Sequence, residues 1–274
     1  MAIVLGSGCF EKPANLTNRT ADAATDGAGA ADAPAALCDV PFSPMVPLRL
    51  GELDGAATGE PTITGDGLDL YWMLQTSGSN YEIHHADRAA VGNSFTTRGR
   101  FTPAPIEATD QDPSISADGD LLVYRGQPGA APKAYFLTRT AGTWSTPALL
   151  PGLEAEVVSS LDLSPDGLTL YFNNGSNNLR RATSASRGAP FVVDPTGLGA
   201  NFSFAAVSAD GREVYYASSG GISRVLRPDT AFGWQMSSMT QVLTEGFDPE
   251  LSPDGESLYV ANGIGISVAT RDCP

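Results

Sequence analysis

The chain has 274 residues, including 30 glycines and 20 prolines, and a formal net charge of −15 at pH 7. Its length fits one large all-β domain, and the glycine and proline content fits short strands joined by turns. The acidic excess repels phosphate backbones and anionic headgroups, so nucleic acid and a bare membrane surface are not expected partners. No stretch approaches the roughly 20 apolar residues that span a bilayer.

The first residues, 1–9, read Met-Ala-Ile-Val-Leu-Gly-Ser-Gly-Cys. A short apolar run that ends in small residues and a Cys resembles the end of a bacterial lipoprotein signal, which implies cleavage and lipidation at Cys9. A stray thiol in a disordered N-terminus is the alternative. Residues 10–37 are rich in Ala, Asp, Gly and Pro, and they predict a disordered tether because they offer little apolar surface to bury.

The segment that begins at Phe42 opens with an aromatic residue followed by Ser. It matches the segments that begin at Phe95 and Trp144. We predict that these two segments, and those that begin at Phe191 and Trp234, are the fourth strands of their repeats. Unlike those segments, the segment at Phe42 is not preceded by the first three strands of a repeat. It is therefore a candidate to complete a repeat elsewhere in the chain.

Five copies of one repeat follow. Each copy carries an Asp-Gly pair, with a hydroxyl residue two places before the Asp and a branched apolar residue three places before it. The pairs lie at 66–67, 118–119, 166–167, 210–211 and 254–255. Their spacing of 44 to 52 residues is about the length of one four-stranded propeller blade. The pattern predicts a β-hairpin whose Gly adopts a positive φ and whose Asp and Ser bind local backbone.

Each repeat predicts four antiparallel strands, and five such sheets predict an all-β, five-bladed β-propeller over residues 38–274. The last repeat ends at Pro274 after its third strand. We therefore expect the strand beginning at Phe42 to complete the last blade and close the ring, which also removes two exposed sheet edges.

Cys38 lies just before the strand that completes the last blade, and Cys273 lies at the end of the third strand of that blade. These positions are two arms of one hairpin in the other blades, so the spacing predicts a Cys38–Cys273 disulfide. Such a bond is typical of an oxidising compartment. It leaves Cys9 as the odd cysteine, which lipidation would explain.

Two segments carry a family resemblance. Residues 112–119 read Asp-Pro-Ser-Ile-Ser-Ala-Asp-Gly and residues 248–255 read Asp-Pro-Glu-Leu-Ser-Pro-Asp-Gly, and both resemble the WD-like repeat of TolB-type propellers. Residues 81–88 resemble the third-strand segment of those repeats. The resemblance implies an exported binding or scaffolding module, periplasmic or on the cell surface of a bacterium and anchored to a membrane. It does not imply that the chain is TolB, which has six blades and an extra domain.

The innermost strands supply the candidate ligand site. Three carboxylates, Glu60, Asp112 and Asp248, stand six residues before a turn Asp, and Asp162 and Glu250 stand four residues before one. If they converge at one end of the channel, they could bind a cation, a basic peptide or a polar ligand. Alternatively, the acid-Pro pairs shape the entry into the strand, and Asp162 and Glu250 form hydrogen bonds between blades.

Other titratable residues predict structure rather than chemistry. The five turn aspartates occupy one position in a repeated tight turn, which indicates a structural role. The two histidines, His84 and His85, are adjacent in a strand and point to opposite faces, so they cannot easily share a metal. A Gly-x-Ser-x-Gly nucleophile motif and a Lys-containing phosphate loop are both absent from the sequence.

These observations predict a non-catalytic, envelope-associated binding or scaffolding propeller that is a monomer, uses no cofactor or metal, is not an enzyme and binds an unidentified envelope protein. The alternative is a glycoside hydrolase-like enzyme with two carboxylates about 5 to 10 Å apart at the channel mouth. A deep pocket lined with aromatic residues would favour that alternative, whereas a shallow or plugged channel would count against it. A lectin would need near-identical pockets between blades, and the loops differ too much for that.

Overall fold

A computed structural model describes residues 38–273 except 51–57, 79, 103–108, 128, 130, 176–177, 201, 231–232 and 235. Residues 38–274 form one compact unit. The predicted lipoprotein-like segment 1–9, with Cys9, and the predicted tether 10–37 lie outside the described residues. In the part of the chain that is described, no helix has the length and hydropathy of a transmembrane segment.

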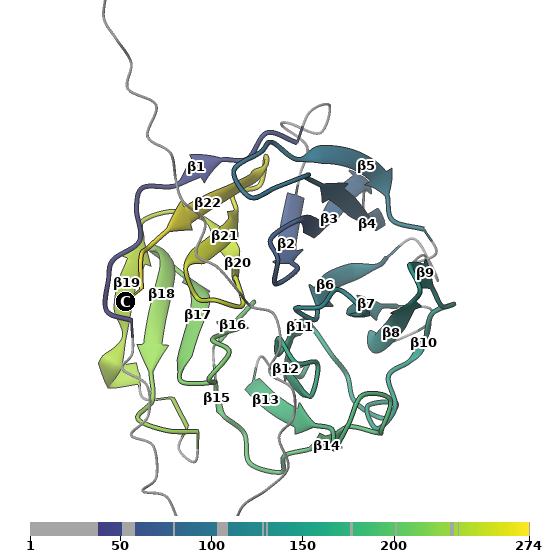
Figure 1. The fold of residues 1–274 in the computed structure, drawn as a ribbon. Coiled ribbons are helices and arrows are strands. Elements are labelled where there is room, and N and C mark those ends of the chain that lie inside the picture. The colour runs from purple at the N-terminus through teal and green to yellow at the C-terminus, as the bar shows by residue number, and fades with distance from the viewer. Residues whose placement is uncertain are drawn as a thin grey trace, which may run out of the picture. The chain divides into compact units, whose positions relative to one another are not determined.

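Five small antiparallel sheets form a ring, and this confirms the predicted five-bladed β-propeller (Figure 1). We number the blades from the first complete repeat. Blade 1 contains β2 (Thr58–Ile63), β3 (Asp69–Ser77), β4 (Asn80–Asp87) and β5 (Thr96–Arg100). Blade 2 contains β6 (Gln111–Ile115), β7 (Leu121–Gly126), β8 (Lys133–Thr140), β9 (Thr143–Trp144) and β10 (Ala148–Leu149). Blade 3 contains β11 (Ser160–Leu163), β12 (Thr169–Asn173), β13 (Asn178–Thr183), β14 (Val192–Val193) and β15 (Gly199–Ala200).

Blade 4 contains β16 (Ala206–Val207), β17 (Glu213–Ser218), β18 (Gly221–Leu226) and β19 (Thr240–Leu243). Blade 5 contains β20 (Phe247–Leu251), β21 (Ser257–Ala261), β22 (Ile266–Thr270) and β1 (Val46–Pro47). The first strand of each repeat lies nearest the axis of the ring, as Figure 1 shows.

The fourth strand of blade 4 begins later than the sequence predicts. Trp234 was expected to open it, but β19 starts at Thr240 and a short 3₁₀ turn, Met236–Ser238, lies between them. Trp234 is buried, and the guanidinium of Arg227 lies over its ring at 4.1 Å. The ring therefore packs inward, and the chain needs a turn before it can join the sheet.

The Asp-Gly turns have the predicted local chemistry. In the first, Thr64 Oγ1 donates to Asp66 Oδ1 at 2.7 Å, and the Leu68 N–H donates to the same oxygen at 3.0 Å. Gly67 has a φ of 69°, which a residue with a Cβ rarely adopts. The turn aspartates 118, 166, 210 and 254 make the equivalent pair of bonds. Their role in the structure is to hold the hairpins.

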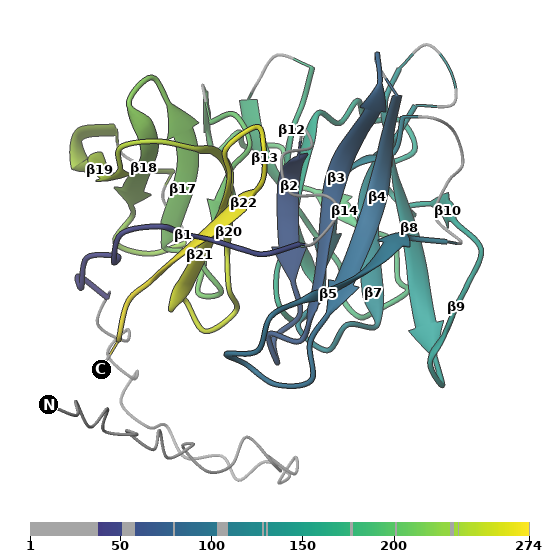
Figure 2. The ribbon, with the colours of Figure 1, turned by 90° about the horizontal axis from the view of Figure 1, so that it is seen from above.

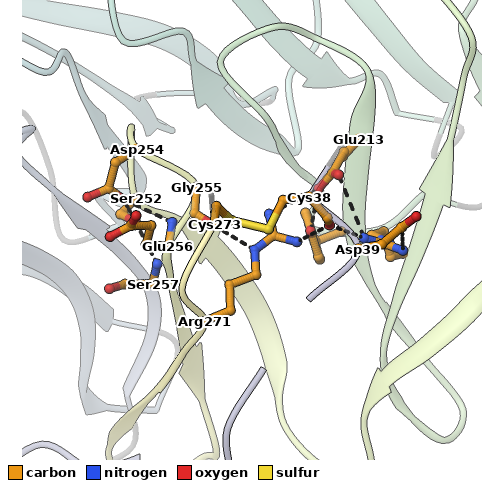
Figure 3. The surroundings of a disulfide bond; sticks show 12 residues. Cys38, Asp39, Glu213, Ser252, Asp254, Gly255, Glu256, Ser257, Arg271 and Cys273 are labelled. Carbon is orange, nitrogen blue, oxygen red and sulfur yellow. Dashed lines mark hydrogen bonds and ion pairs between the residues drawn. A yellow bond between two sulfur atoms is a disulfide. The ribbon is translucent and has the colours of Figure 1, made fainter. Parts of the chain in front are cut away.

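The ring closes as predicted. β1 pairs with β22 in antiparallel register, with Val46 opposite Val268 and Pro47 opposite Ser267. Figure 2 shows β1 (purple) beside β22 (yellow) at one edge of the propeller. A disulfide joins Cys38 to Cys273 across 235 positions of sequence (Figure 3). The two ends of the described chain therefore share one blade and one covalent bond.

Two arginines fasten this closure to its neighbours. Arg224 in blade 4 and Arg271 in blade 5 each donate to the carbonyl oxygen of Cys38 at 2.9 Å. Arg271 also donates to the Gly255 carbonyl at 2.8 Å and forms an ion pair with the buried Glu213 at 3.3 Å (Figure 3). The buried carboxylate is thereby compensated, which a buried charge requires.

A repeated Tyr–Arg pair fills four of the five interfaces between blades. The Tyr stands five residues after a turn Asp. The Arg comes from the end of the third strand of the next blade. Its guanidinium also lies over the aromatic ring of the outer segment in its own blade, at 4.1 to 5.4 Å. The pairs are Tyr259 with Arg88, Tyr71 with Arg139, Tyr171 with Arg227 and Tyr215 with Arg271. The interface between blades 2 and 3 has Val123 and Ser184 at these positions.

We predict that the double substitution Cys38→Ser/Cys273→Ser lowers the free energy of unfolding by about 2–5 kcal/mol, because it frees a very long loop in the unfolded chain. Urea denaturation followed by circular dichroism measures this loss. Cys9→Ser is the control and should leave the midpoint unchanged. Equal stability of the oxidised and the doubly substituted protein would contradict the closure role of the bond.

Candidate functional site

The innermost strands begin with an unusual backbone conformation. Glu60, Asp112, Phe204 and Asp248 have φ values of 48° to 52°, in the left-handed region that non-glycine residues rarely adopt. In blades 1, 2 and 5 a proline follows, and the pairing register with the second strand shifts at this point. These are β-bulges, which redirect side chains at the rim of a sheet. Left-handed non-glycine residues cluster at ligand sites, so the position is a candidate site.

The bulges line a small pocket at the centre of the ring. Its volume, measured as the space open to the centre of a water molecule, is about 20 Å³, which is room for roughly one water-sized group. Its lining residues are Glu60, Pro61, Asp112, Pro113, Ser160, Leu161, Phe204, Ala205, Asp248, Pro249 and Glu250. We call this pocket the channel mouth. Of the five predicted ligand-binding carboxylates, four are in this lining and Asp162 is not.

The carboxylates of the channel mouth also join neighbouring blades. The Asp112 N–H donates to Glu60 Oε2, and the Glu60 N–H donates to the carboxylate of Asp248. Asp112 in turn forms an ion pair with Arg125 of its own blade. Each of the first two bonds runs from a backbone N–H of one blade to a side chain of the preceding blade. The acidic residues of the acid-Pro pairs therefore line the pocket and also form contacts between blades, which was the structural alternative to a ligand role.

A second set of hydrogen bonds joins the blades two residues further along the innermost strands. Thr62, Ser114, Asp162 and Glu250 stand four residues before a turn Asp, and each accepts a hydrogen bond from the backbone of the next blade. The donors are the N–H groups of Ile115 at 3.1 Å, Leu163 at 2.8 Å, Val207 at 2.8 Å and Ile63. Blade 4 has Ala206 at this position, which offers no acceptor. Asp162 and Glu250 thus form the hydrogen bonds between blades that were the alternative to a ligand role.

Sequence reasoning selected the charged members of this set and missed the hydroxyl members. Thr62 Oγ1 accepts from the Ile115 N–H and also donates to Glu250 Oε1 at 2.9 Å. Ser114 performs the same task for Leu163. Their equal spacing from the turn Asp was the available signal, because one repeat position with an acceptor side chain in four copies indicates a shared structural bond.

Burial changes the acidity of these groups. It raises the pKa of Asp162 to about 7, and burial together with the nearby Asp112 raises the pKa of Asp248 to about 7. Burial also raises the pKa of Glu60 and of Glu250 well above the usual value, with Asp112 and Asp162 respectively as the next cause. Carboxyl groups that titrate near pH 7 can give up or take up a proton under neutral conditions.

Within the described ranges, no three His, Cys, Asp or Glu side chains are placed to hold a metal ion. The two histidines bind separate carboxylates. His84 Nε2 lies 3.4 Å from Glu82 Oε2, and His85 Nε2 lies 2.7 Å from Asp69 Oδ1. These contacts agree with side chains on opposite faces of β4.

No family model and no curated protein matches the sequence. Solved structures do match the fold. A family 117 glycoside hydrolase from Zobellia galactanivorans, Zg3597, has a TM-score of 0.60 and 13% identity, over 84% of this chain and 90% of that one. The α-L-arabinofuranosidase PaAbf62A from Podospora anserina, solved with cellotriose, has a TM-score of 0.56 and 13% identity, over 86% and 98% of the two chains. At such identities the likeness shows the fold alone.

TolB proteins are also among the structural neighbours. TolB from Acinetobacter baumannii has a TM-score of 0.47 and 14% identity over 80% of this chain. The chain spans only 55% of the length of that protein. The predicted resemblance is confirmed in part: TolB proteins and other propellers are structural neighbours of this five-bladed fold.

These comparisons correct the prediction that the chain is not an enzyme. Zg3597 and PaAbf62A have the same propeller fold and are enzymes by name. The prediction relied on missing local motifs such as a nucleophile turn. A propeller instead brings together single side chains from several blades at its axis, so the absence of a local motif does not exclude catalysis.

Stability should fall as the pH rises from about 4.5 to about 7. The buried carboxyl groups keep a proton in the folded protein that the unfolded chain has lost, so the stabilisation present at low pH is lost as the pH approaches the raised pKa values. Asp162→Asn should flatten this dependence, because an amide does not titrate but still accepts the bond from Val207. Urea unfolding at several pH values measures it, with the exposed Asp272→Asn as the control. An unchanged pH slope in Asp162→Asn would contradict the raised pKa.

Proposed function

We propose that the chain is an exported binding propeller whose channel mouth receives the ammonium group of a lysine side chain from a partner protein. The observation that carries this proposal is the size of the channel mouth together with its charge. About 20 Å³ of open space admits one compact group, and Glu60, Asp112 and Asp248 surround it. A lysine ammonium is a compact point charge on a slender stem, which suits such a pocket.

Two further features support a cationic ligand. Phe204 lines the same pocket and is 36% exposed, so its ring face can interact with a cation. The net charge of −15 attracts basic partners over a distance set by the ionic strength. Binding of an ammonium group would favour the ionised form of Asp248, so the affinity should rise between pH 6 and pH 8.

The cellular setting that we propose follows from the cysteines. A Cys38–Cys273 disulfide fits an exported protein, because such bonds persist in oxidising compartments. Lipidation of Cys9 would hold the propeller at a membrane of the bacterial envelope, where the partner protein would also lie. We propose that the propeller acts there as a monomer.

A second candidate function is glycoside cleavage at the same pocket. The fold shared with Zg3597 and PaAbf62A favours it, and so do carboxyl groups with a pKa near 7, which suit a general acid. Such an enzyme needs two carboxyl groups on either side of a sugar. The pocket of about 20 Å³ would have to widen to admit a sugar ring, and for this reason we place this function second.

The test of lysine binding uses Nα-acetyl-lysine methyl ester as the probe and isothermal titration calorimetry as the measurement. We expect saturable binding that the norleucine analogue, which lacks the ammonium, does not show. Asp248→Asn should weaken the affinity at least tenfold, because it removes one of the charges that face the cation. Asp272→Asn removes the same charge from an exposed site outside the channel mouth and should leave the affinity unchanged.

Two results would contradict the lysine proposal. One is equal affinity for the lysine and norleucine probes. The other is release of nitrophenol from an aryl α-L-arabinofuranoside that is lost in both Glu60→Gln and Asp248→Asn. The second result would establish the enzymatic candidate in its place.

The membrane anchor predicts that Cys9→Ser moves the protein from the membrane fraction to the soluble fraction of the source cells. The thiol of Cys9 is the attachment point, so a serine cannot carry the thioether-linked lipid. Immunoblotting of the two fractions measures the change, and affinity capture from both fractions compares the partners retained. An unchanged distribution would rule out the anchor while leaving the propeller and its channel mouth as described.

A further inference from the structure

The interface between blades 2 and 3 differs from the other four. At the other interfaces a tyrosine and an arginine meet, as described for Tyr171 and Arg227. Here the tyrosine position holds Val123 and the arginine position holds Ser184. The equivalence is visible in the backbone, since the Ser184 N–H donates to the Leu168 carbonyl as the Arg88 N–H donates to the Leu68 carbonyl.

A pocket of about 190 Å³ lies at this interface. We call it the interblade pocket. Its apolar wall is formed by Leu121, Phe136, Leu150 and Phe191, and Arg139 and Arg187 stand at its polar side. An apolar cavity of about 150 Å³ is large enough to hold a benzene ring in other proteins. The interblade pocket is therefore large enough for one aromatic ring with a small substituent.

The neighbouring interface shows how a tyrosine hydroxyl is held at the equivalent position. Between blades 3 and 4, the Tyr171 hydroxyl lies within 3.0 Å of where a Cβ on Gly211 would be, and Tyr171 interacts with Arg227. The counterpart of Gly211 in blade 3 is Gly167, and Gly167 lines the interblade pocket. At Gly167 the corresponding place is taken by Leu121 Cδ2 and Arg187 Nε, each 3.2 Å from where a Cβ would be, and both residues line the pocket.

Two other contacts are altered in the same place. Phe191 is the counterpart of Trp234, whose ring is covered by Arg227. With Ser184 in the arginine position, that covering guanidinium is missing, and Phe191 forms part of the pocket wall. The Ser184 hydroxyl instead donates within its own loop, to the carbonyl oxygens of Ser186 and Ala189 at 2.8 and 2.9 Å.

A cationic donor is still present at the rim. Arg187 comes from the loop after β13, donates to the Asp166 carbonyl at 3.0 Å and pairs with Asp118 across the interface at 2.5 Å. Its side chain is about a third exposed, so it can also donate to a ligand oxygen. An oxygen on an aromatic ring would then have an arginine partner, as the Tyr171 hydroxyl has in Arg227.

From these observations we infer that the interblade pocket binds a monocyclic phenol. The ring packs against Phe191 and Leu121, and the hydroxyl oxygen accepts a hydrogen bond from Arg187. This site is separate from the channel mouth, since the two pockets share no lining residue. It therefore does not depend on the proposed lysine binding.

The first test uses p-cresol and toluene as probes, with calorimetry of the full chain. We expect one saturable p-cresol site per chain, and about tenfold weaker binding of toluene, because toluene lacks the oxygen that accepts from Arg187. Failure to observe saturable p-cresol binding would overturn the proposal. Equal affinity for the two probes would also overturn it, since the assignment of a phenol rests on that bond.

The second test fills the pocket. Leu121→Thr/Val123→Tyr gives blade 2 the pair that blade 3 carries as Thr169 and Tyr171, and it should weaken p-cresol binding at least tenfold. Ala189→Trp plugs the pocket from the loop after β13 without changing β7, so it serves if the double variant fails to fold. Ala90→Trp places the same ring in the corresponding loop of blade 1 and is the matched control. Undiminished binding in a folded filling variant would overturn the proposal.

Discussion

The structure depends on how the backbone N–H groups of the innermost strands find hydrogen-bond acceptors. Each of these strands is a sheet edge that faces the axis of the ring, where buried N–H groups have no ladder partner and are costly to leave unpaired. Side chains of the preceding blade supply acceptors, as Thr62 and Ser114 do for Ile115 and Leu163. Because such bonds cross four of the five interfaces between blades, the N–H groups that need acceptors also help to hold the ring together.

This constraint explains why acidic side chains are buried at the axis. Asp162 and Glu250 occupy the same repeat position as Thr62 and Ser114, and they serve the same type of donor. Their burial raises their pKa values, so chemistry near neutral pH becomes available as a by-product of a structural bond. Glu250 also lines the channel mouth, so a ligand bound there would meet a group that already joins blade 5 to blade 1.

Most of the fold could be predicted from the sequence because its determinants are local and repeated. The Ser-x-Asp-Gly turn is complete within a few residues, and the cysteine positions and the segment at Phe42 fixed the closure. The path after Trp234 could not be predicted, because it depends on the packing of that ring under Arg227. The width of the channel mouth and the volume of the interblade pocket depend on how the blades tilt, which no single residue determines. The replacement of the Tyr–Arg pair by Val123 and Ser184 is a sequence signal that the predictions did not use.

The fastening of Cys38 has a mechanical consequence. Its carbonyl oxygen is held by guanidinium groups from two blades, and its sulfur is bonded to Cys273, which follows the neighbouring strand β22. A pull on the chain ahead of residue 38 would load a covalent bond and two charged contacts before it reached the two-residue strand β1. The ring would resist peeling from that end, so tension would pass to the disc as a whole rather than unravel it blade by blade.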